Sequence, residues 1–180
     1  MALMRRMNSQ VVARIAFLLL IVACVVPLGL RSLISQKGPS IEIVHASGDH
    51  QTIPLAQMKT KPSLEREGSY QNQYGNWSAS ATYRGILLTD LLGDSGDYAF
   101  VEVVAGDGYR MTVDRWRVVD MDYPLVLAYQ KDGIEVPDWE DGFSIAVLPD
   151  DGSISNVEYG VESAGSYWVK QVTQLILTSE

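Results

Sequence analysis

Residues 68–92 read GSYQNQYGNWSASATYRGILLTDLL and join two kinds of sequence that rarely lie side by side. The first half consists of small, aromatic and amide side chains, and no ionisable catalytic group lies between Glu67 and Arg84. The second half has the pattern of a short apolar helix. The first half is therefore either a ligand-binding loop or a solvated loop that Trp77 anchors in the core.

Strand signals dominate the chain after residue 40. Alternating or continuous apolar runs, each bounded by turn residues, predict strands at 41–45, 51–53, 100–105, 110–113, 125–129, 144–148 and 168–177. Short helical turns are expected at 54–58, 89–92 and 114–119, with Thr89 as a cap, Asp90 in the first turn and Gly93 at the end of the second. This pattern predicts an α+β, β-rich, sandwich-like domain with little helix.

The first forty residues have a different character. The stretch from Ile15 to Leu30 contains no charged residue and is bracketed by Arg14 and Arg31. It would cover roughly 24 Å as a helix, so the flanking arginines would have to snorkel across a hydrocarbon core of about 30 Å. It is expected to be one transmembrane helix.

The charge distribution around this helix sets the predicted topology. Basic residues precede it, which predicts a cytoplasmic N-terminus at 1–14, a single membrane pass at 15–30, a linker at 31–40 and an extracytoplasmic domain at 41–180. The membrane is therefore the first expected partner.

Three alternatives are open for this segment. A retained signal anchor is favoured, because no small-x-small cleavage site lies between the apolar run and Arg31. A cleaved signal peptide is the second alternative. A lipoprotein signal is the third, since residues 21–24 resemble a lipobox and make Cys24 a lipidation candidate. A buried core helix is disfavoured because the run has no polar face.

Composition limits the chemistry of the rest of the chain. A length of 180 residues with 47% apolar and 20% charged residues fits one globular domain. Cys24 is the only cysteine, which excludes disulfides, thiolate catalysis and cysteine-ligated metals from residues 41–180. That part carries nine basic and 22 acidic residues, a net charge of −13. Such a charge repels nucleic acid, so no nucleic-acid partner is expected.

Aromatic and amide residues of the first stretch are the candidate pocket, because they supply stacking and hydrogen bonds without charge. They include Tyr70, Asn72, Gln73, Asn76 and Trp77. Asn76 also begins a glycosylation sequon, which matters only in a cell that has the glycosylation machinery.

Arg84 and Arg110 are candidates to meet an anion, and pairing with surface carboxylates is the competing interpretation. No metal site is expected from His45 and His50, because no third ligand is evident. The acidic residues between 138 and 151 lack the ligand spacing of calcium loops. No catalytic triad, acid pair or phosphate-binding glycine loop can be argued from spacing.

The order of the aromatic, glycine and strand motifs resembles the oxidoreductase molybdopterin-binding domain of the sulfite oxidase family. The resemblance covers about residues 41–177. It rests on Trp77, Tyr83-Arg84-Gly85, Leu88 to Leu92, Asp107-Gly108-Tyr109, Leu127-Ala128-Tyr129, Asp132-Gly133, Gly142, Pro149, Trp168-Val169-Lys170 and Val172.

The resemblance implies a pterin cofactor whose molybdenum is ligated by one cysteine shortly before Trp77. The counted position is Gln73, and no residue from Ser69 to Asn76 is a cysteine. Amides and neutral phenols cannot replace a soft thiolate donor. Active relatives also carry an arginine on the strand that reads IAVL at 145–148 here. Tyr109 and Lys170 remain candidate cofactor-binding residues, but molybdopterin is disfavoured and the cofactor stays unknown.

These observations lead to three hypotheses. The first is a membrane-anchored extracytoplasmic domain with the molybdopterin oxidoreductase fold that binds a small molecule or a protein without redox catalysis. The second is an active molybdopterin-dependent oxidoreductase with an atypical metal site. The third is a purely structural role at the cell surface.

Overall fold

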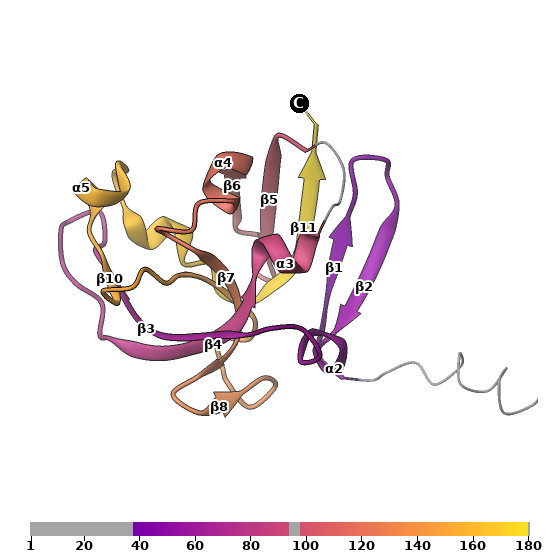
Figure 1. Ribbon diagram of the computed structural model, residues 1–180, viewed down its shortest axis with the longest axis horizontal. Coiled ribbons are helices and arrows are strands. Elements are labelled where there is room, and N and C mark those ends of the chain that lie inside the picture. Colours follow the sequence, from indigo (N-terminus) through magenta and orange to yellow (C-terminus); the bar gives the residue numbers. More distant parts are fainter. Residues whose placement is uncertain (1–37, 94–97, 180) are drawn as a thin grey trace, which may run out of the picture. The chain divides into compact units, whose positions relative to one another are not determined.

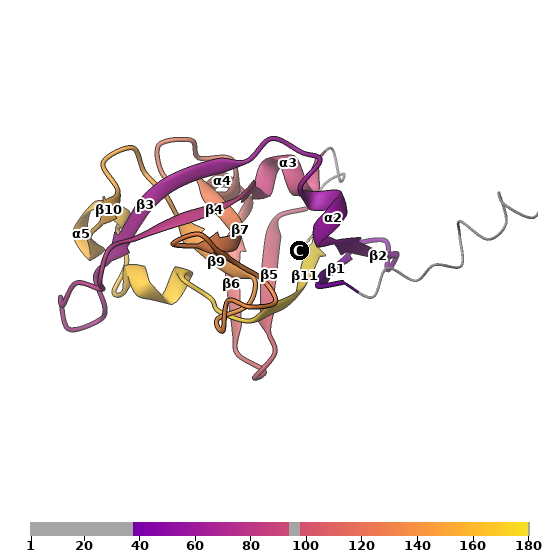
Figure 2. The same cartoon turned by 90° about the horizontal axis from the view of Figure 1, so that it is seen from below.

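Two β-sheets make up the part of the chain that the computed structural model describes, residues 38–93 and 98–179. The first sheet has the strand order β2-β1-β11-β5-β6, with β1 Ser40–Val44, β2 His50–Pro54, β5 Phe100–Ala105, β6 Arg110–Asp114 and β11 Val172–Thr178. The second has the order β10-β3-β4-β7-β8, with β3 Leu64–Tyr70, β4 Ala81–Leu87, β7 Leu125–Lys131, β8 Ile134–Glu135 and β10 Ser153–Ile154. Strand β9, Ser144–Val147, pairs with β7. Figures 1 and 2 show β3 and β4 running crosswise to β5 and β11.

Helices are short and lie between the strands. They are α2 Leu55–Met58, α3 Leu88–Leu92, α4 Arg115–Val118, α5 Asn156–Tyr159 and the 3₁₀ turn η1 Ala164–Tyr167. A β-rich domain with little helix is therefore confirmed for the described residues. Gly93 ends α3 and Asp90 lies in its first turn, as predicted. The prediction that Thr89 caps α3 is wrong: β4 continues directly into α3, so Leu87 occupies the cap position and makes no side-chain cap bond.

The closing strand starts later than its sequence suggests. Residues 168–177 are predicted as one strand, but β11 begins at Val172. The preceding residues bond to the other sheet, where the amide of Ile145 donates to the carbonyl of Val169 (2.8 Å). The chain then bends at Gln171, whose φ of 51° lies in the left-handed region. This crossing segment, residues 168–172, carries the chain from one sheet to the other.

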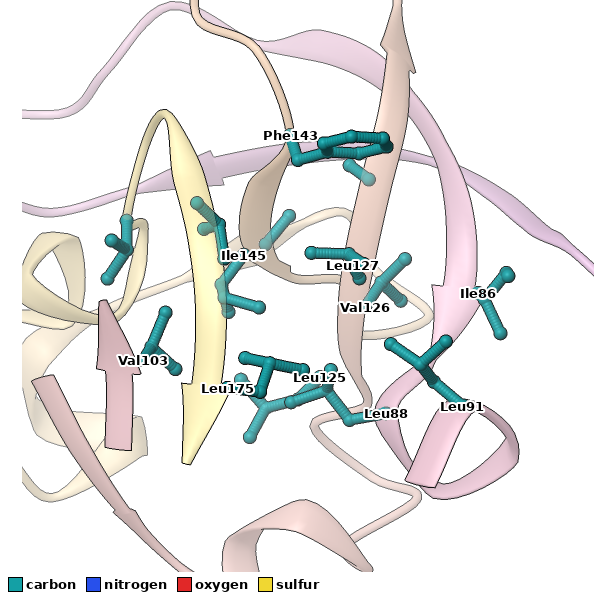
Figure 3. Close-up of a cluster of buried hydrophobic side chains, with 14 of the residues drawn as sticks. Ile86, Leu88, Leu91, Val103, Leu125, Val126, Leu127, Phe143, Ile145 and Leu175 are labelled. Atoms are coloured by element: carbon teal, nitrogen blue, oxygen red, sulfur yellow. The ribbon is translucent and has the colours of Figure 1, made fainter. Parts of the chain in front are cut away.

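One hydrophobic core joins the two sheets (Figure 3). Leu127 and Ile145 reach it from β7 and β9, and Leu175 and Val103 reach it from β11 and β5. All four side chains are completely buried. The continuous apolar runs that predicted β7 and β9 are explained by this position, because a strand covered on both faces has no polar alternation.

Some predictions concern residues that the structure does not describe. The expected transmembrane helix Ile15 to Leu30 and the lipidation candidate Cys24 both lie outside the described residues. Within residues 38–93 and 98–179, no helix has the length and apolar character needed to cross a membrane.

Substituting Gly85 by alanine tests the close approach of β4 to β7. The pairing of these strands is irregular between Arg84 and Gly85. A β-carbon on Gly85 would lie 2.6 Å from the Cα of Ala128 and would also overlap the carbonyl of Leu127. Because these are backbone atoms, relief requires the two strands to separate. We expect Gly85→Ala to lower the free energy of unfolding by about 1–3 kcal/mol in urea denaturation.

Gly106→Ala is the matched control, because the nearest atoms to its β-carbon would be 3.6 Å away. We expect a change within about 0.5 kcal/mol there. Equal losses in the two variants would contradict the steric explanation.

Candidate functional site

A pocket of about 140 Å³ lies where four aromatic side chains from separate segments converge. Tyr70 comes from the end of β3 and Tyr83 from β4. Trp139 comes from the loop between β8 and β9, and Trp168 from the crossing segment. We call this the aromatic pocket.

The four rings contact one another in geometries that stabilise aromatic pairs. Tyr70 and Trp168 have ring centres 4.9 Å apart at an interplanar angle of 36°. Tyr83 meets Trp168 edge-on at 5.0 Å and 70°, and it lies 6.2 Å from Trp139. Three of the four side chains, those of Tyr83, Trp139 and Trp168, are buried, so the walls of the pocket are fixed by packing.

Two glycines make room for the pair of Tyr70 and Trp168. A β-carbon on Gly68 would lie 2.5 Å from the Cη2 of Trp168, and one on Gly165 would lie 2.7 Å from the Tyr70 ring. Any larger residue at either position would push a ring out of place. Gly68 is one of the small residues of the 68–92 stretch, and packing explains it, because a side chain there would collide with Trp168.

Two lysines and one aspartate provide the charges of the pocket. The carboxylate of Asp141 lies 3.0 Å from the ammonium of Lys170 and 4.0 Å from that of Lys131. The amide of Gln171 donates to the carbonyl of Asp141 (2.7 Å), which fixes this loop against the crossing segment. Lys131 also lies 5.7 Å from the centre of the Tyr83 ring. The three charged groups sum to one positive charge.

Tyr83 is a neutral phenol at physiological pH. Burial, together with the neighbouring groups Tyr70, Asp132 and Asp141, raises its pKa to about 12. A phenol with this pKa is neither a general base nor an anionic metal ligand near neutral pH.

The predicted loop contributes to the pocket only through its base. Tyr70 lines the pocket, together with Ser78 and Ala79 on the return side. The side chain of Asn72 instead holds the loop, because its Oδ1 accepts from the amides of Tyr74 (2.9 Å) and Asn76 (3.0 Å). Gln73, Asn76 and Trp77 are exposed and do not line the aromatic pocket.

Among the other predicted residues, only Lys170 reaches the pocket. Arg84 contacts Ser63 (3.2 Å) and Glu65 (3.7 Å). Arg110 pairs with Glu102 at 2.7 Å, and the hydroxyl of Tyr109 donates to the carbonyl of Ser166 (3.4 Å). Both arginines therefore form the carboxylate pairs that the sequence offered as the competing interpretation.

Metal ligands do not gather in the described part of the chain. No group of three or more histidine, cysteine, aspartate or glutamate side chains there could hold a metal ion. His50 pairs with Glu42 at 2.7 Å, and this hydrogen bond lowers the pKa of that carboxyl. The carboxylate of Asp141 forms ion pairs with Lys131 and Lys170, and it does not belong to a cluster of carboxylates within the described residues.

Sequence reasoning missed Trp139 and Lys131 as pocket residues and considered Asp141 only as a calcium ligand. Tyr83 and Trp168 entered only as parts of the family resemblance. One local signal was available. Trp139 is a large aromatic residue between Asp138 and Glu140, and such a residue in an acidic turn indicates that the turn packs against the core.

Two wider hollows have less aromatic character. One of about 530 Å³ includes Lys61, Arg115 and a single aromatic residue, Tyr98. The other, of about 370 Å³, includes Ile134 and shares Lys131, Trp139 and Asp141 with the aromatic pocket. Neither combines converging rings with unmatched charge, so the aromatic pocket is the better candidate.

Comparison with known proteins identifies the fold. No family model matches this chain, and no curated protein matches it. Among solved structures, the chain is similar to the sulfane dehydrogenase SoxCD from Paracoccus pantotrophus, with a TM-score of 0.57 and 13% identity. The chain therefore shares its fold with part of that structure. The match covers 78% of this chain but 38% of that one, so this chain spans well under half of its length. The likeness supports the sulfite-oxidase-type fold that the sequence resemblance implies, and it concerns the fold alone.

The residues of the aromatic pocket do not fit a molybdenum-bearing pterin. A volume of about 140 Å³ is well below the roughly 300–1,000 Å³ of sites that enclose drug-sized ligands. The described residues include no cysteine, and Tyr83 is not anionic. The lysines that could meet a pyrophosphate share one carboxylate, which offsets part of their charge.

Asn156 is expected to hold the base of the loop beside the pocket. Its side chain donates to the carbonyl of Asn72 (2.8 Å) and accepts from the amide of Ala164 (2.7 Å), where η1 begins. Asn156→Ala leaves these part-buried groups without their partner, so we expect the free energy of unfolding to fall by about 1–3 kcal/mol. The near-ultraviolet circular dichroism of the Tyr70–Trp168 pair should weaken.

Asn76→Ala is the control for this substitution, since Asn76 is exposed on the same loop. Within the described residues only backbone hydrogen bonds of Asn76 are found. We expect its effect to stay within about 0.5 kcal/mol. A loss as large as that of Asn156→Ala would show that general loosening of the loop is responsible.

The raised pKa of Tyr83 predicts a loss of stability at high pH. The unfolded phenol ionises near pH 10, whereas the folded one resists ionisation up to about pH 12. The stability that the neutral Tyr83 phenol contributes is therefore complete below pH 10, and it is lost as pH rises toward 12. We expect the free energy of unfolding of Tyr83→Phe to fall less steeply over this window than that of the unmodified protein. Parallel pH profiles would refute the assignment.

Proposed function

We propose that this chain is a membrane-anchored extracytoplasmic binding domain that uses the oxidoreductase fold without redox catalysis, and that its ligand is a small molecule held in the aromatic pocket. The sequence supports the anchor through the apolar run Ile15 to Leu30 and the basic residues before it. The fold likeness supports descent from an oxidoreductase scaffold. Function on such a scaffold depends on the site and not on the fold.

The composition of the pocket is the observation that carries this proposal. Its walls are packed aromatic rings, its volume is about 140 Å³, and its two lysines share one carboxylate. A cavity of this size holds a molecule of about one ring, because an engineered cavity of about 150 Å³ binds benzene. The same features leave no soft anionic donor for a transition metal.

An active oxidoreductase with an atypical metal site is the second candidate, and the likeness to a sulfane dehydrogenase favours it. It requires molybdenum to be held without a thiolate from residues 41–180, because the only cysteine is Cys24. The two candidates differ in one measurable property, which is whether the protein carries the metal and the pterin.

Metal and pterin analysis decides between them. We expect the full chain, purified in detergent from a molybdenum-replete host, to contain neither molybdenum nor pterin in stoichiometric amount. Molybdenum is measured by elemental mass spectrometry, and the pterin by fluorescence after oxidation. A molybdopterin enzyme expressed in the same host serves as the positive control for cofactor supply. One molybdenum and one pterin per chain would overturn the proposal and establish the second candidate.

A further inference from the structure

We infer that the ligand of the aromatic pocket is a small planar molecule with one carboxylate, whose ring packs against the aromatic walls and whose carboxylate binds Lys131. This inference rests on the proposed binding function and names its ligand class. It follows from the size and aromatic walls of the pocket, from its net charge and from the ammonium of Lys131, which makes no hydrogen bond within the described residues.

The size and walls of the pocket specify a single ring. Tyr83 lies between Trp168 and Trp139, with ring centres 5.0 Å and 6.2 Å away. A flat apolar ring can continue this arrangement by stacking or edge contacts. At about 140 Å³ the pocket has no room for a nucleotide or a second ring system.

Lys131 is the cation that lacks a full set of partners. Its ammonium is 4.0 Å from Asp141, at the outer limit of an ion pair, and its side chain is 32% exposed. No hydrogen bond of this ammonium is found within the described residues. Lys170, by contrast, is 3.0 Å from the same carboxylate and 58% exposed. The Lys131 ammonium therefore has donors available for a charge-assisted hydrogen bond to a ligand acceptor.

Trp168 contributes shape rather than polarity to the pocket. Its side chain is 9% exposed, and its Nε1–H has no hydrogen-bond partner in the described part of the chain. This nitrogen is closed off from solvent, so its N–H does not face the space that a ligand would occupy. The hydroxyl of Tyr159 is also unpaired, but Tyr159 does not line this pocket.

The charges select a monoanion over a cation or a neutral molecule. Two ammonium groups face one carboxylate, which leaves one positive charge to be matched. Aromatic cages commonly bind cations, but here Lys131 already lies over the Tyr83 ring at 5.7 Å. A second cation would be repelled by it, whereas a carboxylate would form a charge-assisted hydrogen bond.

Three probes of the same shape and different charge test this inference: benzoate, benzamide and benzylamine. The full chain in non-ionic detergent is titrated with each, with detergent alone as the blank, and binding is followed by tryptophan fluorescence and calorimetry. We expect saturable binding of benzoate that is about tenfold or more tighter than that of benzamide, because a charge-assisted hydrogen bond is lost in the amide. Benzylamine should bind more weakly than either.

Lys131→Met keeps the length of the side chain over Tyr83 and removes its charge. We expect this variant to bind benzoate about tenfold more weakly and to lose its preference over benzamide. Lys59→Met is the matched control: Lys59 pairs with Glu135 at 2.8 Å and does not line the pocket, so benzoate affinity should be unchanged. Near-ultraviolet circular dichroism verifies folding, and Lys131→Arg, which retains the charge, should keep the preference for benzoate.

The outcomes separate this inference from the proposed function. Equal affinity for benzoate and benzamide, preference for benzylamine, absence of saturable benzoate binding, or an unaffected Lys131→Met variant would each overturn the inference. None of these would affect the proposal of a non-redox binding domain, which fails only if the chain carries molybdenum and pterin.

Discussion

The crossing segment, residues 168–172, is the constraint on which the rest of the structure depends. It bonds first to the β9 side, through Val169, and then enters the other sheet as β11. The left-handed backbone at Gln171 makes this change of direction, and the Gln171 amide is paired with Asp141. The same few residues make hydrogen bonds to both sheets and present Trp168 and Lys170 to the pocket.

Likeness of fold does not by itself fix the chemistry of this protein. The chain shares its fold with part of a sulfane dehydrogenase at 13% identity. What a redox cofactor needs is local: space, a soft ligand and unpaired cations. Here the space is small, no cysteine lies in the described part of the chain, and the two lysines share the single carboxylate of Asp141.

Much of the fold could be predicted, and the reasons are local. Continuous apolar runs identified β7 and β9, and the turn at 106–108 identified the β5–β6 hairpin. Strand β3 was missed because its LERE sequence places charges on an exposed face, and β8 and β10 are two residues long. The candidate loop had the right composition for binding, but the side-chain oxygen of Asn72 accepts hydrogen bonds from amides of the loop itself, those of Tyr74 and Asn76.

By itself the sequence determined that the domain is rich in strands, that it is acidic and that no thiol follows Cys24, because these depend on composition and on period along the chain. It did not determine which aromatic residues meet. Tyr70, Trp139 and Trp168 are brought together by strand register and by the bend at Gln171. Contacts between residues so far apart in the chain leave no periodic signal, so only the tertiary structure decided where the pocket lies and which charges face it.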